Sequence, residues 1–530
     1  MINWYKYLDI RKKILISIIG FLLLGILNHH ITKSFMTIYS MVYSYLIFLL
    51  LIILLTINFK RIISKFKEVH NKTWFLLIIL LLSFMFLDLQ LPNFYGMTID
   101  EPSIIHIASN IASNESNIFC EPGFEKNQCG LSFLPFGWTF INSLVFKIFG
   151  ISAKTSKIII LLFHLLAIIA CFLFLQYVSR KEWISLLGTL IFASSSLFLY
   201  WSQTLNSIIP ATGFLLTTLL FLLMFLREKK LWQNNLLLIS LTWTVYIRTE
   251  MAILIIPIGI VYLSNIEFFK DKKNFFSTIL LLIIFSSFLN FIPHFIETQK
   301  AFLSGTEQIF GMNILLSNIF LESSHWIQGA YLPLSFLTLA MIGVIFSLKK
   351  ERFETIIIIS TILSILFVYL FWHYSNQRRF FITILPIITL YIALGAQYTS
   401  LILRKFMGKK ALILIVLIIL IIGILGLVNE VKKIDSIEED YYDSEKIEEL
   451  MPDNCSLIMA EPVMLPFIDN KKKISFNSIT NSNTSCFISI NCVFFYYDNH
   501  CRERDNCREF IDRPDVEKKE IIDDLLYRII

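Results

Sequence analysis

The stretch "LLLISLTWTVYIRTEMAILIIPIGIVYL", residues 236–263, decides how the chain is organised, because it can form one membrane crossing or two. A single helix over 235–264 would be about 45 Å long and would place Arg248 near the middle of the bilayer. An arginine at that depth costs roughly 2.5–3.5 kcal/mol on insertion scales. Two short crossings, 235–248 and 251–264, avoid this cost and leave "YIRTE" as a hairpin outside the membrane.

Apolar runs of similar length recur along most of the chain, which is 56% hydrophobic and only 16% charged. A helix of about 20 apolar residues spans the hydrocarbon core of a bilayer. The sequence therefore predicts an α-helical polytopic membrane protein with about 13 transmembrane helices. The first run, 14–27, is not followed by a small-residue cleavage site and is expected to stay as an anchor. The expected crossings are 14–30, 36–58, 73–90, 157–178, 183–200, 208–226, 235–248, 251–264, 277–293, 333–348, 355–372, 380–398 and 411–428.

The basic residues lie in alternate short loops, such as "FKRIISKFKEVHNK" (59–72), "REKK" (227–230) and "FKDKKN" (269–274). Cytoplasmic loops carry an excess of Lys and Arg, so these loops and the N-terminus are expected in the cytoplasm. The opposite loops and the tail 429–530 are then expected outside a multi-pass cell-membrane protein. The net charge of +6 reflects this topology and does not indicate a nucleic-acid partner.

The tail 431–530 is polar and is expected to form a small extracytoplasmic α/β domain. The apolar runs "CSLIMA" (455–460) and "CVFFYYD" (492–498) predict strands. The segments "DSEKIEELM" (443–451) and "VEKKEIIDDLLYRI" (516–529) are expected to be helical.

An outer loop contains "GMTIDEPSIIHIASN", residues 96–110, in which Asp100 and Glu101 are adjacent. Pro102 and an apolar pattern from Ile104 to Ala112 predict an amphipathic helix that lies on the membrane and begins near Asp100. Asp100 can then be a simple N-cap residue with an acidic neighbour, or a catalytic acid. The spacing alone leaves both interpretations open.

Seven of the eight cysteines are expected on the outer side, where an oxidising compartment favours disulfides. One candidate pair would close the loop that follows Asp100, and the other pairs would brace the tail. A metal site is not predicted: zinc held by His500 and cysteines of the tail is the less favoured alternative, since the spacing lacks the CxxC pairs of structural zinc sites. The disulfide candidates are Cys120 with Cys129, Cys486 with Cys492, and Cys501 with Cys507.

The order of the motifs carries a family resemblance. An acidic pair in the first large outer loop precedes an apolar segment that ends in "IFG", an outer arginine hairpin and "RRFFITILP" at 378–386. Over roughly 73–430 this order resembles the glycosyltransferase C superfamily, in particular protein O-mannosyltransferases and lipid A aminoarabinose transferases. Residues 1–72 are then two additional N-terminal transmembrane helices, and 91–156 is the outer catalytic loop.

The resemblance implies transfer of a sugar from a polyprenyl (undecaprenyl or dolichyl) phosphate to a protein, lipid or glycan acceptor on the outer face. An inverting displacement needs a base for the acceptor proton, and the resemblance assigns this role to Asp100, with Glu101 beside it. Arginine suits the leaving phosphate, and a divalent metal is possible, with no other cofactor implied. The candidate phosphate ligands are Arg248, Arg378 and Arg379, and their possible supports are Glu250 and His373.

Two other functions compete with the transferase. A transporter or flippase of lipid-linked sugars would also be polytopic, but it should show matched halves and ionisable groups at midplane depth. A noncatalytic relative that binds lipid-linked sugars would share every feature above. The arginines could equally extend to membrane lipid headgroups. His164, inside a crossing, is expected to make an interhelical hydrogen bond.

Overall fold

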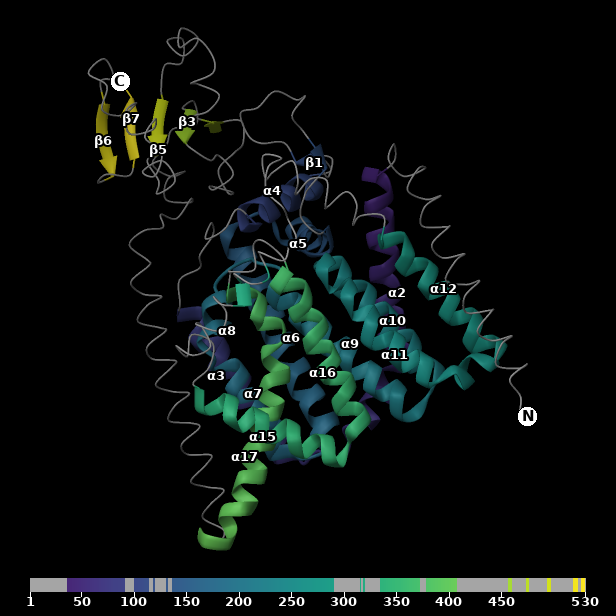
Figure 1. The fold of residues 1–530 in the computed structure, drawn as a ribbon. Helices are drawn as coiled ribbons and strands as arrows, with labels where there is room; N and C mark the ends of the chain where they lie inside the picture. The colour runs from purple at the N-terminus through teal and green to yellow at the C-terminus, as the bar shows by residue number, and fades with distance from the viewer. Residues whose placement is uncertain are drawn as a thin grey trace.

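The structure is a computed structural model, and Figure 1 shows it as a helical bundle with a separate small sheet. Parts of the chain lie outside the described residues, including the first expected crossing and the last. The described residues are 36–90, 100–113, 118–119, 130–131, 136–289, 315, 318–319, 334–371 and 378–407, and the strand residues 456–459, 473–475, 493–496, 518–522 and 526–529.

Helices form the bundle, with short 3₁₀ segments at some of their ends. The first half contains α2 (Met36–Ser64), α3 (Asn71–Gln90), α4 (Asp100–Ala112), α5 (Phe136–Phe149), α6 (Ala153–Ser179), α7 (Glu182–Ala193), α8 (Ser196–Trp201) and α9 (Ile208–Glu228). The second half contains α10 (Leu231–Ile247), η2 (Thr249–Leu254), α11 (Ile255–Ser264), η3 (Ile266–Lys270), α12 (Lys272–Leu289), α15 (Leu334–Lys350), α16 (Arg352–Phe371), η4 (Arg378–Thr383) and α17 (Leu385–Met407). Two short antiparallel strands, β1 (Ile118–Phe119) and β2 (Gly130–Leu131), follow α4.

Helices occupy every expected crossing that lies within the described residues. Among the described residues, six helices are long and apolar enough to cross a membrane by themselves. The chain leaves the helical conformation at Arg248, where α10 ends with φ −145° and ψ 111°. The expectation of a helical multi-pass membrane fold is therefore confirmed. The number thirteen stays a prediction, since 14–30 and 411–428 lie outside the described residues.

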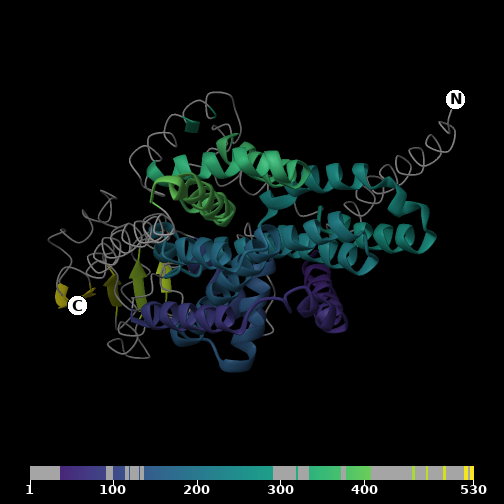
Figure 2. The same cartoon turned by 90° about the horizontal axis from the view of Figure 1, so that it is seen from below.

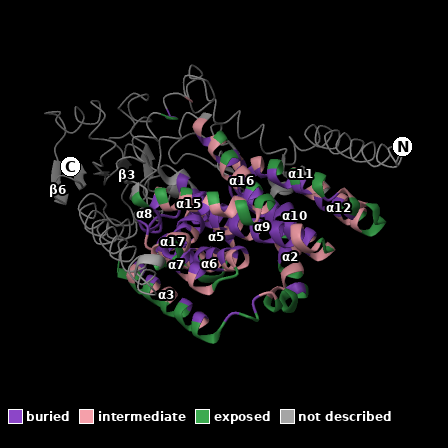
Figure 3. Ribbon diagram, turned by 60° about the horizontal axis from the view of Figure 1, so that its bottom comes forward, coloured by how far each residue is buried: buried purple, intermediate pink, exposed green. Residues whose placement is uncertain are grey.

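Helix α9 lies at the centre of the bundle. In the most apolar part of this helix 83% of the residues are buried, against 22% in α3. Figure 3 shows the same contrast, with α9 and α10 largely purple and α3 largely green. Large apolar side chains on α3, including Phe75 and Phe86, are exposed. Such an apolar exterior around a packed core suits a protein surrounded by lipid.

Direct contacts bring several of the basic loops together at one end of the bundle. Lys65 forms an ion pair with Glu228, which joins the loop after α2 to the end of α9. The backbone N–H of His70 donates to a carboxylate oxygen of Glu182 over 3.0 Å, which joins the same loop to the start of α7. We call this the basic end. Its loops are those that the charge pattern places together in the cytoplasm.

A second contact at the basic end joins distant parts of the chain. Arg227, at the end of α9, donates two hydrogen bonds to Glu354 of α16, over 2.6 and 2.5 Å. A third hydrogen bond, of 2.8 Å, reaches the carbonyl oxygen of Tyr177 in α6, and the guanidinium lies 4.5 Å from the centre of the Tyr177 ring. Bidentate pairing of this kind fixes geometry as well as charge.

Two glycines allow α15 and α17 to cross closely. A Cβ atom at Gly343 would overlap the carbonyl oxygen of Tyr391, and one at Gly395 would overlap the carbonyl oxygen of Leu339. Small residues at a crossing let helix backbones approach, which is a common basis of helix association in membranes. The two helices therefore form a tightly packed pair beside the bundle core.

The described part of the tail is a five-stranded mixed sheet in the order β4-β3-β5-β7-β6. Its strands are β3 (Ser456–Met459), β4 (Lys473–Ser475), β5 (Val493–Tyr496), β6 (Lys518–Ile522) and β7 (Leu526–Ile529). The predicted strands in 455–460 and 492–498 are confirmed as β3 and β5. The predicted helix over 516–529 is wrong, because β6 and β7 pair antiparallel there and β7 also pairs with β5. A short apolar run is compatible with the periodicity of a helix or of a strand, and pairing with distant strands selects the strand. The helix expected at 443–451 lies outside the described residues, so the α/β class stays a prediction.

We predict that Gly395→Ala lowers the apparent melting temperature of the detergent-solubilised protein. The added methyl group cannot be accommodated without moving backbone, and overpacking of this kind costs about 1–3 kcal/mol. Gly259→Ala in α11 is the matched control, because no atom lies within 4 Å of a Cβ at that position. Equal melting temperatures for both variants would contradict the close crossing.

Candidate functional site

The end of the bundle opposite the basic end contains an irregular polar segment between α8 and α9. This segment, "SQTLNS" at 202–207, is buried throughout. A side chain of the segment provides a hydrogen-bond partner for the start of α9: the carboxamide oxygen of Asn206 accepts from the backbone N–H of Ile208 over 3.1 Å. The indole N–H of Trp138 in α5 donates to the carbonyl oxygen of Leu205 over 2.7 Å. Buried backbone outside a helix needs such partners.

A buried carboxylate anchors the start of this segment. Oδ1 of Asp88, near the end of α3, accepts from Ser202 Oγ over 3.1 Å and from Gln203 Nε2 over 2.8 Å. Nδ1 of His164 in α6 lies 3.7 Å from the same oxygen, and both side chains are at most 2% exposed. Asp88 therefore joins α3, α6 and α8 where the helical chain is interrupted. A buried charge is tolerated when it is hydrogen-bonded in this way.

Arg248 lies at the second interruption, between α10 and η2. Its Nε donates to Glu250 Oε1, and its Nη1 lies 3.3 Å from the hydroxyl oxygen of Ser207, to which it donates. The side chains of Arg248 and Glu250 are 8% and 7% exposed. Glu250 therefore balances the charge of Arg248, and its role as a support in the site stays a prediction. The contact with Ser207 joins the two interruptions into one site.

Helices α4 and α5 pack at this same end. A Cβ at Gly137 in α5 would lie 2.7 Å from the carbonyl oxygen of Tyr246, so α5 approaches the end of α10 two residues before Arg248. Helix α4 packs on α5 and begins at Asp100, where the sequence places its start. Its apolar face is buried within the protein, which corrects the expectation of a helix lying on the membrane surface. The side chains of Asp100 and Glu101 lie outside the described structure.

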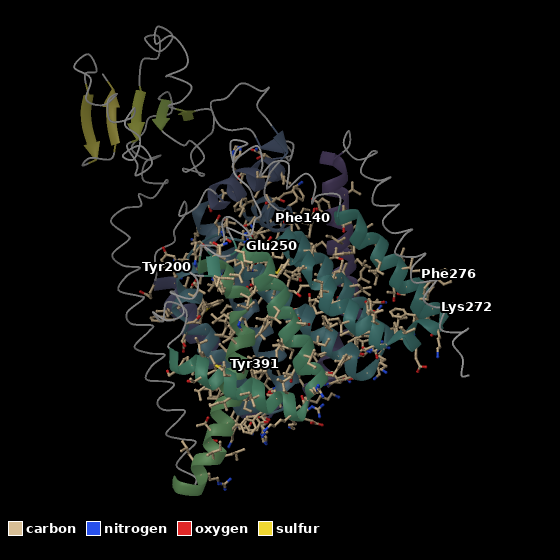
Figure 4. The ribbon with its side chains drawn as sticks, in the orientation of Figure 1. Phe140, Tyr200, Glu250, Lys272, Phe276 and Tyr391 are labelled. Atoms are coloured by element: carbon tan, nitrogen blue, oxygen red, sulfur yellow. The ribbon has the colours of Figure 1, made fainter. Side chains whose placement is uncertain are left out.

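The 3₁₀ segment η4 packs against α8 and α9. Its backbone begins at Arg378, and its later residues Phe381 and Thr383 are buried. The side chains of Arg378 and Arg379 are outside the described structure. Their backbone nevertheless lies on the helices that flank 202–207. Figure 4 shows Glu250 in the upper part of the bundle, away from Lys272 and Tyr391.

The structure thus brings Arg248 and Glu250 together and places the segments carrying Asp100, Glu101, Arg378 and Arg379 at the same end. His373 and all the disulfide candidates lie outside the described residues: Cys120, Cys129, Cys486, Cys492, Cys501 and Cys507. Among the described residues no group of three His, Cys, Asp or Glu side chains could hold a metal ion.

Sequence reasoning missed the residues that hold the site together, namely Asp88, Gln203 and Ser207. The usable signal was the density of polar residues in "SQTLNS", which is unusual inside an apolar run. Trp201, directly before this segment, packs inside the protein and is only 8% exposed. For His164, the structure gives the expected neighbour across helices, but its Nδ1 has no hydrogen-bond partner among the described residues.

The charges and hydrogen bonds of this site determine which chemical steps it can support. A guanidinium group buried at a helix end, balanced by one carboxylate and one hydroxyl, can bind an oxyanion more strongly than an exposed one. Acids on a neighbouring helix start could accept a proton. Phosphate binding and proton transfer are the two elements that group transfer from a phosphate ester requires.

Part of the chain matches a known family of sequences. The sequence pattern of the family described as dolichyl-phosphate-mannose-protein mannosyltransferase matches residues 134–291. These residues include α5, the segment 202–207, Arg248 and α12. Among curated proteins no match is found.

Solved structures extend the similarity to most of the chain. ArnT from Cupriavidus metallidurans bound to undecaprenyl phosphate is 9% identical, with a TM-score of 0.56 over 87% of this chain and 98% of that one. The archaeal oligosaccharyltransferase AglB from Archaeoglobus fulgidus, in complex with an inhibitory peptide and a dolichol-phosphate, is 12% identical, with a TM-score of 0.50 over 81% and 70%. The chain therefore shares the fold of ArnT and AglB, and its residues 134–291 match the pattern of the mannosyltransferase family.

Proposed function

We propose that this protein transfers a sugar from a polyprenyl phosphate-linked donor to an acceptor on the outer face of the membrane. The observation that carries the proposal is the buried Arg248, held by Glu250 and Ser207 at the end of the bundle where α4 begins with two acids. The fold of ArnT, solved with undecaprenyl phosphate, supports the same assignment.

The reaction is a single displacement at the anomeric carbon. An acceptor oxygen forms the new bond to this carbon while the bond to the phosphate oxygen breaks, and the electron pair leaves with the polyprenyl phosphate. Asp100 takes the proton of the acceptor group, with Glu101 beside it. Attack opposite the leaving group inverts the anomeric centre. A positioned base contributes about 10²- to 10⁴-fold to the rate of such a step.

The departing phosphate needs cations as its charge develops. Arg248 provides one guanidinium within a largely dry environment, where each contact is stronger than in water. Arg378 and Arg379 would add two more, since η4 packs on α9, whose first residue, Ile208, follows Ser207. His373 precedes η4 in sequence and would support them.

The position across the membrane of the two helix interruptions, at 202–207 and at Arg248, favours an enzyme over a transporter. Helix α9 has 21 residues, so Ile208 and Glu228 are about 30 Å apart along its axis, close to the thickness of the hydrocarbon core. The segment 202–207 therefore lies near a membrane surface when the basic end lies at the other. Transporters instead bind their substrates near the midplane. On the proposed orientation the basic end and the N-terminus face the cytoplasm, and the C-terminal domain faces outside.

We predict that Asp100→Asn lowers the rate of sugar transfer by about 10²- to 10⁴-fold, because the amide cannot accept the acceptor proton. The measurement is transfer from a radiolabelled polyprenyl phosphate sugar by purified protein. Glu101→Gln is the matched control: adjacent helical residues point about 100° apart, so both cannot occupy the same position. The control should lose much less activity. Full activity of Asp100→Asn would remove Asp100 from the mechanism, and a transfer-inactive wild-type protein would support the noncatalytic alternative.

We also predict that Arg248→Lys lowers kcat/KM for the lipid-linked donor by about 10- to 100-fold. Lysine keeps the charge but loses the planar fork, and one hydrogen bond to a charged group contributes about 1.5–3 kcal/mol. Arg352→Lys, an exposed residue at the basic end, is the control and should behave as wild type. Steady-state kinetics with varied donor would show the difference. Unchanged kinetics for Arg248→Lys would mean that the guanidinium does not contact the phosphate.

A further inference from the structure

A groove at the basic end lies far from the candidate site and takes no part in the proposed transfer. It lies between the end of α2, the start of α10 and the start of α12, and its volume is about 690 Å³. In Figure 2 the purple α2 lies beside the teal helices α10 and α12, which form the other walls of the groove. Its cationic lining consists of Arg61, Lys65, Lys230 and Lys273.

In the described part of the chain, fewer carboxylates than cations lie around this groove. Glu228 pairs with both Lys65 and Lys230, the latter over 3.0 Å. Asp271 lies near Lys273, but one of its carboxylate oxygens accepts the backbone N–H of that lysine over 3.0 Å. Like charges gathered around one groove repel each other, and a bound anion relieves this repulsion.

The cationic lining is partly fixed in place before any ligand binds. Nη1 of Arg61 donates to the carboxamide oxygen of Asn58 over 3.1 Å, and the amide of Asn58 donates to the carbonyl oxygen of Leu54 over 2.9 Å. Asn58 is buried, so this chain of hydrogen bonds orients the exposed guanidinium toward the groove. Preorganisation of this kind lowers the entropic cost of binding.

The groove also has an apolar side, which distinguishes a lipid from a free anion. Leu54, Ile57 and Trp232 belong to its lining. Ile57 is 68% exposed, and the apolar surface continues along α2 through the exposed Ile53 and Leu49. Cations above a continuous apolar strip match a phosphate headgroup with acyl chains attached. Basic pockets between transmembrane helices on the cytoplasmic side are typical sites for anionic lipids.

We propose that this groove binds one anionic phospholipid, with its phosphate among the four cations and its acyl chains along α2. The lipid would join α2 to α10 and α12 at the basic end. The proposal concerns a site separate from the transferase site and does not depend on the proposed function. It places this end of the protein against a leaflet that contains anionic lipids.

The test measures lipid retention by native mass spectrometry of the full-length protein in detergent with equal amounts of phosphatidylglycerol and phosphatidylcholine. The wild-type protein should retain phosphatidylglycerol in preference. Each cation near a lipid surface contributes about 1 kcal/mol, or about 5-fold, so the double variant Arg61→Gln, Lys273→Gln should lose about 30-fold of this preference. Lys67→Gln, an exposed lysine of the same loop outside the groove, is the matched control and should keep it.

Arg61→Lys, which conserves the charge, separates loss of charge from misfolding and should stay within about 3-fold of wild type. Equal retention of both lipids by the wild type, or an unchanged preference in the double variant, would overturn the proposal. Displacement of the lipid by millimolar inorganic phosphate would make the groove a site for free phosphate. Efficient disulfide formation between Ile57→Cys and Ile19→Cys would show that the first apolar run of the chain fills it. Both results would count against a bound lipid.

Discussion

The requirement that buried backbone groups find hydrogen-bond partners shapes this end of the molecule. Inside an apolar bundle, the six buried residues 202–207 leave the helical conformation, so their peptide groups need partners other than those of a helix. Trp138 supplies a partner for the carbonyl oxygen of Leu205, and Asp88 accepts hydrogen bonds from the side chains of Ser202 and Gln203. Helices α3, α5 and α6 are therefore fixed relative to the start of α9. The geometry of the candidate site follows from this irregular segment.

The same segment explains how a charged side chain is tolerated next to it. Ser207 is the last residue of 202–207 and accepts a hydrogen bond from Arg248, whose charge Glu250 balances. An isolated guanidinium at this depth would be costly, whereas a paired and hydrogen-bonded one is held in a defined orientation. A phosphate that approaches would find a cation already desolvated and in place. Electrostatic preorganisation of this kind is a common source of catalytic rate.

The sequence predicts the helical organisation well because membrane insertion depends on local properties. Apolar length locates the helices, and the cost of a central arginine predicts the interruption at Arg248. The charge pattern also predicts which loops meet, as the contact between Lys65 and Glu228 shows. The role of Asp88 could not be predicted, because its partner Gln203 is 115 residues away and a lone acid near a helix end has many meanings. The strands β6 and β7 were not predicted for a related reason. Their conformation depends on the pairing of β7 with β5 and with β6, and the pairing with β5 is a nonlocal interaction.

The bidentate pair of Arg227 with Glu354 has a consequence for motion. It fastens α16, in the part of the chain after residue 334, to α9, in the part before residue 289, and its guanidinium also bonds to α6. At the other end of the bundle α16 also packs against η2, and η4 packs against α8 and α9. The two parts of the chain are therefore joined at both ends of the bundle, and separating them would require breaking contacts at both.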